Sequence, residues 1–177
     1  LQFHIQPIST DKLGGANLHD FHAFTPTVAN IRPTSKGEIT ISSSDSRVNP
    51  KIKMNYLSTD EDRKVASDGI KLIRKIVMET NEFKKYEPEE FRPGSHLNEK
   101  EEIVKACSHY AQTIFHPVGT CKMGNDESAV VSDKLKVHGL NKLRVIDASI
   151  MPNITSGNTN APTIMIAEKG ADMILSS

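Results

Sequence analysis

The chain has 177 residues, enough for a domain with its own hydrophobic core. Its 22 Lys and Arg residues balance its 22 Asp and Glu residues, so neither a nucleic acid nor an anionic membrane is indicated as a partner. No apolar run approaches the roughly 20 residues of a membrane-spanning helix. The two cysteines, Cys107 and Cys121, are too few for a disulfide scaffold or a zinc cluster, and no metal site is predicted. Cys107 falls on the apolar face of a predicted helix, which favours a buried thiol.

The chain begins with Leu1, and its first residues have neither the charged nor the apolar region of a signal peptide. We therefore expect either a processed chain or a piece of a longer one. The amino-terminal residues leave the localisation open.

The first third of the chain alternates short runs of apolar and polar residues, the pattern of strands with one buried face. Four strands are predicted, over residues 1–5, 24–31, 38–42 and 51–56. Pro26 favours an edge position for the second strand. Residues 12–20 contain Gly-Gly without periodicity and predict a loop. Because the links between the strands are short and contain no helix, we expect an antiparallel sheet.

Two helices are predicted after the strands. Ser58 and Glu61 have the spacing of a capping box, and an apolar stripe with helical spacing follows them. Asn98 and Glu101 repeat the capping-box spacing ahead of a second apolar stripe over residues 103–114. The second helix therefore delivers the chain to the residues that follow position 114.

The last part of the chain predicts two short strands and a helix. The strands cover residues 135–137 and 143–146, and the second has the apolar density of a buried strand. Residues 164–174 predict a helix with Asn160 as its N-cap. Residues 164–166 are Ile-Met-Ile, so the first half of this helix is expected to be buried on all sides.

Three dense stretches stand out from this scaffold. Residues 116–124 read His-Pro-Val-Gly-Thr-Cys-Lys-Met-Gly, residues 147–152 read Asp-Ala-Ser-Ile-Met-Pro, and residues 156–163 read Ser-Gly-Asn-Thr-Asn-Ala-Pro-Thr. The glycines of the first stretch allow a sharp bend or a close approach to a ligand. A histidine alone is most often structural, but this one precedes two further ordered motifs.

Together the three stretches resemble the carboxy-terminal part of the glucose–methanol–choline (GMC) oxidoreductases, which are FAD-dependent alcohol oxidases and dehydrogenases. They are most similar to the insect glucose-dehydrogenase-like and the choline-dehydrogenase-like members. Three motifs in order are a specific signal. The family binds FAD through an amino-terminal Gly-x-Gly-x-x-Gly domain, and the chain has no such run. The resemblance therefore implies a carboxy-terminal piece, with secretion as one option for its localisation.

The implied fold class is α+β. Residues 1–114 would form a substrate-binding cap of antiparallel sheet and helices. Residues 115–177 would carry the catalytic motif and return to the FAD-binding α/β domain, whose amino-terminal part is the missing partner. The partners implied are that domain and a small-molecule alcohol, with no nucleic acid and no membrane span.

The resemblance also assigns site residues. Flavin accepts the hydride of the alcohol, and His116 takes the hydroxyl proton, a task suited to imidazole near neutral pH. Asn160 would hydrogen-bond the substrate oxygen, although it could serve only as a helix cap, and Asn158 is the second choice for this role. The positions facing FAD would be Asp147, Ala148, Pro162 and Thr163. For Asp147, a turn residue at a strand end is an equal alternative.

The predicted function is thus the carboxy-terminal part of an FAD-dependent alcohol dehydrogenase or oxidase that acts on the CH–OH group. This chain alone is expected to be inactive and to bind FAD weakly, because the pyrophosphate-binding part is missing. The alternative is a non-catalytic interaction or structural protein derived from the same fold.

Overall fold

The computed structural model describes residues 1–11 and 17–176 and divides the chain into two compact units. Unit 1 comprises Leu1–Asn30 and Tyr56–Ile114, and unit 2 comprises Ile31–Asn55 and Phe115–Ser177. The segment 31–55, assigned from the sequence to the region 1–114, therefore packs with the carboxy-terminal part of the chain. Most of the loop predicted at residues 12–20 lies outside the described residues.

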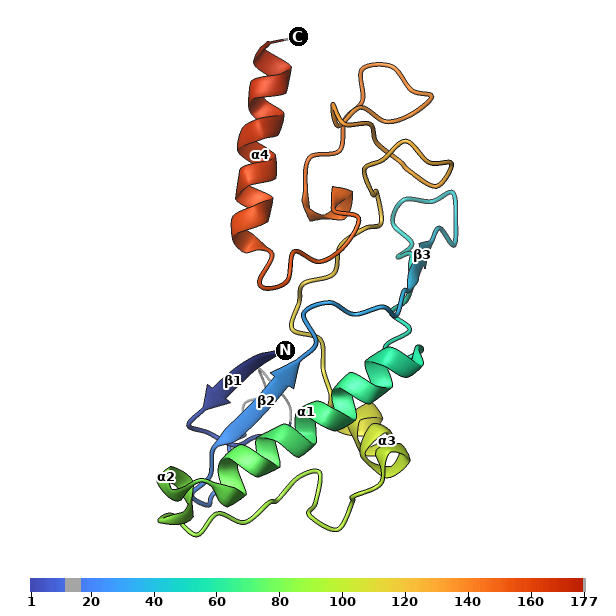
Figure 1. The fold of residues 1–177 in the computed structure, drawn as a ribbon. Coiled ribbons are helices and arrows are strands. Elements are labelled where there is room, and N and C mark those ends of the chain that lie inside the picture. The colour runs from blue at the N-terminus through green and yellow to red at the C-terminus, as the bar shows by residue number, and fades with distance from the viewer. Residues whose placement is uncertain (12–16, 177) are drawn as a thin grey trace. The chain divides into compact units, whose positions relative to one another are not determined.

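Unit 1 is built on a pair of antiparallel strands and a long helix (Figure 1). Strand β1 (Gln2–Gln6) pairs with β2 (Thr25–Ala29), which confirms both predicted strands. The apolar side chains of β1, Phe3 and Ile5, are exposed, so the buried face predicted for this strand is wrong. Helix α1 (Asp60–Glu79) packs on β2 through Gly69, where a Cβ atom would lie only 2.9 Å from both methyl carbons of Val28. A glycine is therefore required for the helix to come this close to the strand.

The two predicted helices of unit 1 are present, but each of the two N-caps lies one residue later than predicted. Thr59, not Ser58, caps α1, and its side chain accepts a hydrogen bond from the backbone N–H of Asp62. Helix α3 (Lys100–Tyr110) is capped at Glu99, not Asn98. The Glu102 carboxylate accepts from the N–H groups of both residues, so it closes the capping box one position further on.

A short helix, α2 (Asn81–Lys84), follows α1, and a half-buried ion pair joins the next loop to α1. Arg74 of α1 binds Glu90 through two hydrogen bonds of 2.8 and 2.9 Å. Its remaining donors reach the carbonyl oxygens of Leu97 and Gly94. The side chains of Arg74 and Glu90 are only 17% and 12% exposed, so this pair is shielded from solvent.

Unit 2 contains a second antiparallel pair, β3 (Glu38–Thr40) and β4 (Lys51–Lys53). These strands confirm the positions of the last two strand predictions, at shorter length. The predicted buried face is wrong for both, because every residue of β3 and β4 is exposed. The α+β class with antiparallel pairing is correct, but the strands form two separate two-stranded sheets. The Arg32 side chain donates a 2.7 Å hydrogen bond from Nε to Ser156 Oγ and so links the two sequence segments of unit 2.

The core of unit 2 lies among loops, the 3-10 helix η1 (Ala148–Ile150) and helix α4 (Asn160–Leu175) (Figure 1). Its buried residues are Val131, Leu135, Ile150, Met151 and Ile166. The strands predicted near positions 135 and 143 are wrong, since only isolated bridges such as Lys136 with Arg144 form there. Leu143 is 48% exposed, so the apolar density of residues 143–146 does not mark a buried strand in this chain.

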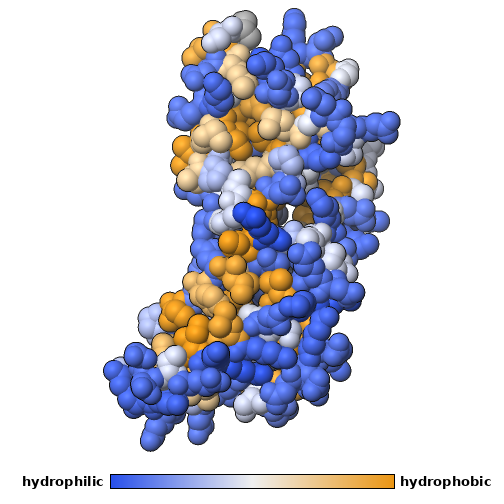
Figure 2. Space-filling view, viewed as in Figure 1, coloured by the Kyte–Doolittle hydropathy of each residue, from blue (hydrophilic) through white to orange (hydrophobic). Residues whose placement is uncertain are grey.

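Helix α4 buries one side only. Ile166 is 7% exposed, whereas Ile164 and Met165 are 55% and 59% exposed, so burial on all sides is wrong for this chain. Ile174 and Leu175 at the far end are also exposed, and hydrophobic residues reach the surface over α4 in Figure 2. In residues 1–11 and 17–176, no helix combines the length and apolar character needed to cross a membrane.

Candidate active site

The first two dense stretches lie side by side in unit 2. The backbone N–H of Cys121 donates to the carbonyl oxygen of Ser149 at 3.0 Å, and that of Met123 donates to Ile150 at 2.8 Å. Gly119 has φ +94°, in the left-handed region that favours glycine. Residues 116–124 are thereby held against residues 147–152.

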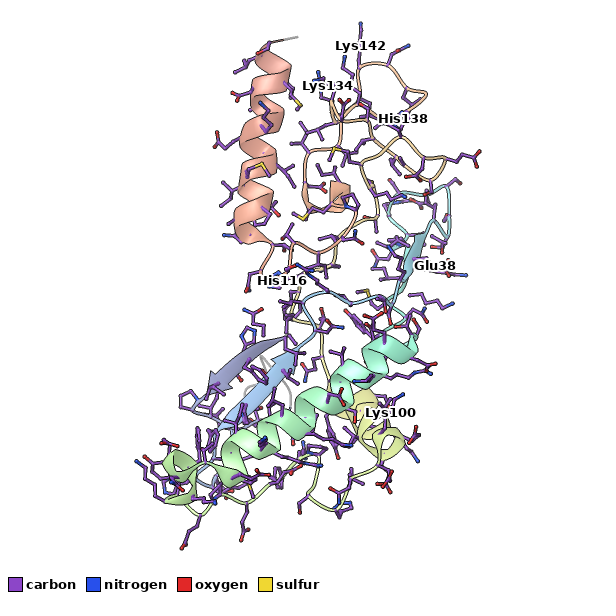
Figure 3. All side chains as sticks on the ribbon, viewed as in Figure 1. Glu38, Lys100, His116, Lys134, His138 and Lys142 are labelled. Atoms are coloured by element: carbon purple, nitrogen blue, oxygen red, sulfur yellow. The ribbon has the colours of Figure 1, made fainter. Side chains whose placement is uncertain are left out.

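His116 joins the first stretch to the third. His116 is half-buried and is labelled in Figure 3. Its ring contacts Asn158 and Thr159, the two residues that precede α4. Nδ1 is 2.9 Å from Thr159 Oγ1, and Nε2 is 2.8 Å from Asn158 Nδ2. Both ring nitrogens of His116 are therefore engaged by the same short loop, more than forty positions further along the chain.

Asn160 occupies a different place from the one predicted. It is the first residue of α4 and is exposed, while Thr159 is the N-cap, so the predicted cap at Asn160 is wrong. Of the two candidate asparagines, Asn158, the second choice, contacts His116. Thr159 was missed, although a threonine directly before a helix is a common N-cap and could have marked the helix start.

The start of α4 has no side-chain cap. Thr163, half-buried, donates both its N–H and its hydroxyl to the carbonyl oxygen of Thr159, at 3.0 and 2.6 Å. Pro162 has no N–H, which leaves the N–H groups of Asn160 and Ala161 at the positive end of the helix dipole. This end of α4 is thus suited to an electron-rich group.

Asp147 and Ala148 lie at the start of η1. The exposed Asp147 accepts a 2.7 Å hydrogen bond from the N–H of Ser149, as a turn residue does. Ala148 is half-buried and packs against the core cluster. The backbone at Asp147 is therefore fixed by its own side chain.

The loop after the first stretch is held by charge. Asp126 accepts hydrogen bonds from Ser128 and Lys122, which hold the pKa of its carboxyl well below its ordinary value. His138 Nε2 lies 3.0 Å from the carbonyl oxygen of Gly124. Among the described residues no group of three His, Cys, Asp or Glu side chains could hold a metal ion.

With this geometry in place, the class of protein follows from comparison with known proteins. The GMC oxidoreductase family model matches residues 33–167. The chain therefore belongs to the GMC oxidoreductases, and the resemblance inferred from its motifs is confirmed.

Among curated members of the family, the chain is similar to choline dehydrogenases. The chain is 44% identical to the oxygen-dependent choline dehydrogenase of Proteus mirabilis over 174 residues, which are 98% of this chain and 31% of that protein. It is 42% identical to the enzyme of the same name from Pseudomonas savastanoi, again over 98% of this chain and 30% of the relative. The chain thus spans about a third of the length of these curated relatives.

Solved structures agree with this assignment. Pyridoxine 4-oxidase from Mesorbium loti superposes with a TM-score of 0.77 at 34% identity, over 83% of this chain and 28% of the other. Formate oxidase from Aspergillus oryzae, which was studied for modification of its FAD, superposes with a TM-score of 0.79 at 34% identity. That match covers 86% of this chain and 27% of the oxidase.

Proposed function

We propose that this chain is the carboxy-terminal part of an FAD-dependent enzyme that oxidises the CH–OH group of a small alcohol. Membership of the GMC oxidoreductases and the similarity to choline dehydrogenases support this reading, and they make choline the first alcohol to test. The observation that carries the proposal is the 2.8 Å contact between His116 Nε2 and Asn158 Nδ2. In this proposal the ring nitrogen of His116 is the proton acceptor, and the Asn158 amide beside it is a hydrogen-bond donor.

A hydroxyl group is complementary to this pair, because its oxygen accepts one hydrogen bond while its hydrogen donates another. On binding, the alcohol hydroxyl takes the place of the direct contact between Asn158 and His116, because Nε2 has a single lone pair. Its oxygen then accepts from Asn158 Nδ2, and its O–H donates to His116 Nε2. His116 then takes the hydroxyl proton at Nε2 as the oxygen becomes a carbonyl. Since the Asn158 amide cannot trade a proton, it serves as a donor to the negative charge that develops on the oxygen.

The residues at the start of α4 fit FAD. When bound, FAD supplies the acceptor for the hydride that leaves the alcohol carbon. The N–H groups of Asn160 and Ala161, with the helix dipole behind them, suit an electron-rich ring edge. Pro162 and Thr163 belong to the same helical turn, and the Asp147 carboxylate has further acceptor capacity for hydroxyl groups.

We also propose that the exposed apolar side chains of α4 contact the amino-terminal FAD domain. Four such residues, Ile164, Met165, Ile174 and Leu175, are between 50% and 85% exposed. An exposed set of this kind marks an interaction surface more often than a free one. Since the chain spans only 31% of the Proteus mirabilis relative, the relative contains the additional chain that such a surface would require.

The base is tested in the full-length protein by His116→Ala, with anaerobic stopped-flow measurement of flavin reduction by choline. We expect a loss of about 10²–10⁴-fold in the rate constant with bound FAD retained, the usual contribution of a general base. Reduction at the wild-type rate would remove His116 from this role.

Matched variants decide between Asn158 and Asn160 as the donor to the substrate oxygen. Asn158→Asp replaces the donor by a carboxylate beside a developing negative charge, so flavin reduction should slow strongly. Asn160→Asp places its charge in the first turn of α4, where a helix tolerates an acid, and should be the milder change. The opposite order would restore Asn160 as the donor.

A further inference from the structure

We propose that Thr159 is a positioning residue that fixes the tautomer of His116, holding the proton on Nδ1 and the lone pair of Nε2 toward Asn158. The inference rests on the proposed function, in which Nε2 accepts the hydroxyl proton. It concerns a side chain of the third dense stretch to which the sequence assigned no role. The argument starts from what the Thr159 hydroxyl does in place of capping its helix.

Thr159 is the N-cap of α4, yet its side chain makes no capping hydrogen bond. A threonine in this position ordinarily accepts from a backbone N–H of the first turn. Here Oγ1 instead lies 2.9 Å from His116 Nδ1. The helix thus gives up a stabilising hydrogen bond at its start, and the hydroxyl serves the imidazole.

The position of Thr159 is fixed on every side. The residue is 7% exposed, so its hydroxyl is shielded from exchange with solvent. Its carbonyl oxygen accepts two hydrogen bonds from Thr163, which anchors the backbone to the first turn of α4. The backbone of Thr159 is thus held beside the ring, and its hydroxyl is buried there.

The contacts at the ring indicate which nitrogen carries the proton. A neutral imidazole has one N–H and one lone pair. The Asn158 amide nitrogen donates to Nε2 at 2.8 Å, which requires the lone pair there and the proton on Nδ1. The Thr159 hydroxyl, 2.9 Å from Nδ1, can accept that proton's hydrogen bond.

One contact opposes this tautomer. The backbone N–H of Thr159 points toward Nδ1 at 3.4 Å and would favour a lone pair on that nitrogen. It is the longest of the three contacts and so the weakest. The two shorter contacts are satisfied together only with the proton on Nδ1. They outweigh the longer contact from the backbone N–H.

This tautomer prepares His116 for its reaction. Nε2 presents its lone pair on the side of Asn158, where the alcohol hydroxyl is expected. As the alcohol O–H bond breaks and the Nε2–H bond forms, Nδ1–H continues to donate to Thr159. The hydroxyl then also stabilises the positive imidazolium, since hydrogen bonds from charged groups are the stronger ones.

The first test reads the tautomer directly. The full-length protein is labelled with ¹⁵N-histidine, and His116 is assigned by the signal that His116→Gln removes. At a pH where His116 is neutral, its spectrum should report the Nδ1–H tautomer in the wild type and a shift toward Nε2–H in Thr159→Val, which has the same shape without the hydroxyl. Thr159→Ser keeps the hydroxyl and should restore Nδ1–H. A wild-type ring with its proton on Nε2 would overturn the proposal.

The second test is kinetic. Thr159→Val should slow flavin reduction by about tenfold or more with little change in the substrate dissociation constant, and Thr159→Ser should recover most of the rate. Ser156→Ala is the control, since it loosens the same loop by removing the 2.7 Å bond from Arg32 but leaves His116 untouched. Equal losses in the Val and Ala variants would reduce Thr159 to a structural role. If His116→Ala is itself without effect, the proposed function fails, while the tautomer measurement still judges this inference.

Discussion

Gly170 of α4 lies directly against Ile146, so closely that a Cβ atom on the glycine would overlap the Cγ2 methyl group and lie 3.0 Å from Cδ1. Gly170→Ala should therefore destabilise the chain by about 1–3 kcal/mol through overpacking, although alanine favours a helix by about 1 kcal/mol. Denaturant unfolding monitored by circular dichroism measures the change. Added stability would mean that α4 can move away from Ile146.

The same contact offers a rescue. Ile146→Ala alone should destabilise the chain, because it removes partly buried methyl groups that pack on the core. Combined with Gly170→Ala, it should cost less than the sum of the two single changes, since the overlapping atoms are gone. Strict additivity in this double-mutant cycle would show that the two residues do not interact.

The ion pair of Arg74 and Glu90 should be important for the stability of unit 1. Arg74→Met keeps the apolar stem but leaves a shielded carboxylate without its partner, and we expect a loss of roughly 3 kcal/mol in the free energy of unfolding. Lys64→Met breaks the exposed pair with Asp68 on the same helix and should have almost no effect. Comparable losses of unfolding free energy in the two variants would mean that Arg74 is as accessible to solvent as Lys64.

The N-cap of α1 can be tested by a matched pair of changes. Thr59→Ala removes the hydrogen bond to the Asp62 N–H and should cost about 1 kcal/mol in stability. Ser58→Ala, one position earlier, leaves that bond in place and should cost less. Thermal unfolding of both variants ranks them, and the reverse order would return the cap to Ser58.

Cys107 should react slowly with alkylating agents. Burial raises the pKa of its thiol, so at a given pH a smaller fraction is present as the reactive thiolate. Iodoacetamide labelling at pH 8, followed by mass spectrometry, should modify Cys107 more slowly than glutathione in the same solution. In guanidinium chloride the difference should disappear. Rapid labelling of the folded protein would contradict the burial of this cysteine.

The sequence was informative wherever local pattern decides structure. β1 and β2 follow from alternation, and α1 from its apolar stripe, because these periods are properties of the elements themselves. Helix starts were displaced by one residue where neighbouring positions, such as Ser58 and Thr59, could both cap. Only the packing of the helix selects between such neighbours.

The candidate active site likewise has one residue that its local sequence identified and partners that only the fold reveals. His116 could be identified from its motif, but its partners Asn158 and Thr159 lie more than forty positions away. Which of Asn158 and Asn160 meets the ring depends on the residue at which α4 begins, and this is set by the contact of the helix with the core. The prediction that Ile164 and Met165 are buried was wrong for another reason. An apolar pattern shows that side chains tend to be covered, but not that the covering segment is present.

The segments of the two units alternate along the chain, and this restricts which parts can be exchanged with a relative by recombination. Unit 2 is assembled from 31–55 and 115–177, with most of unit 1 encoded between them. Because the hydrogen bond from Arg32 to Ser156 joins those two segments, any single recombination point between them would match an arginine with a serine from a different ancestor. Chimaeras with relatives should therefore remain stable only when both segments come from one parent. An exchange of residues 56–114 then requires two crossover points, one at each end, rather than one at position 114.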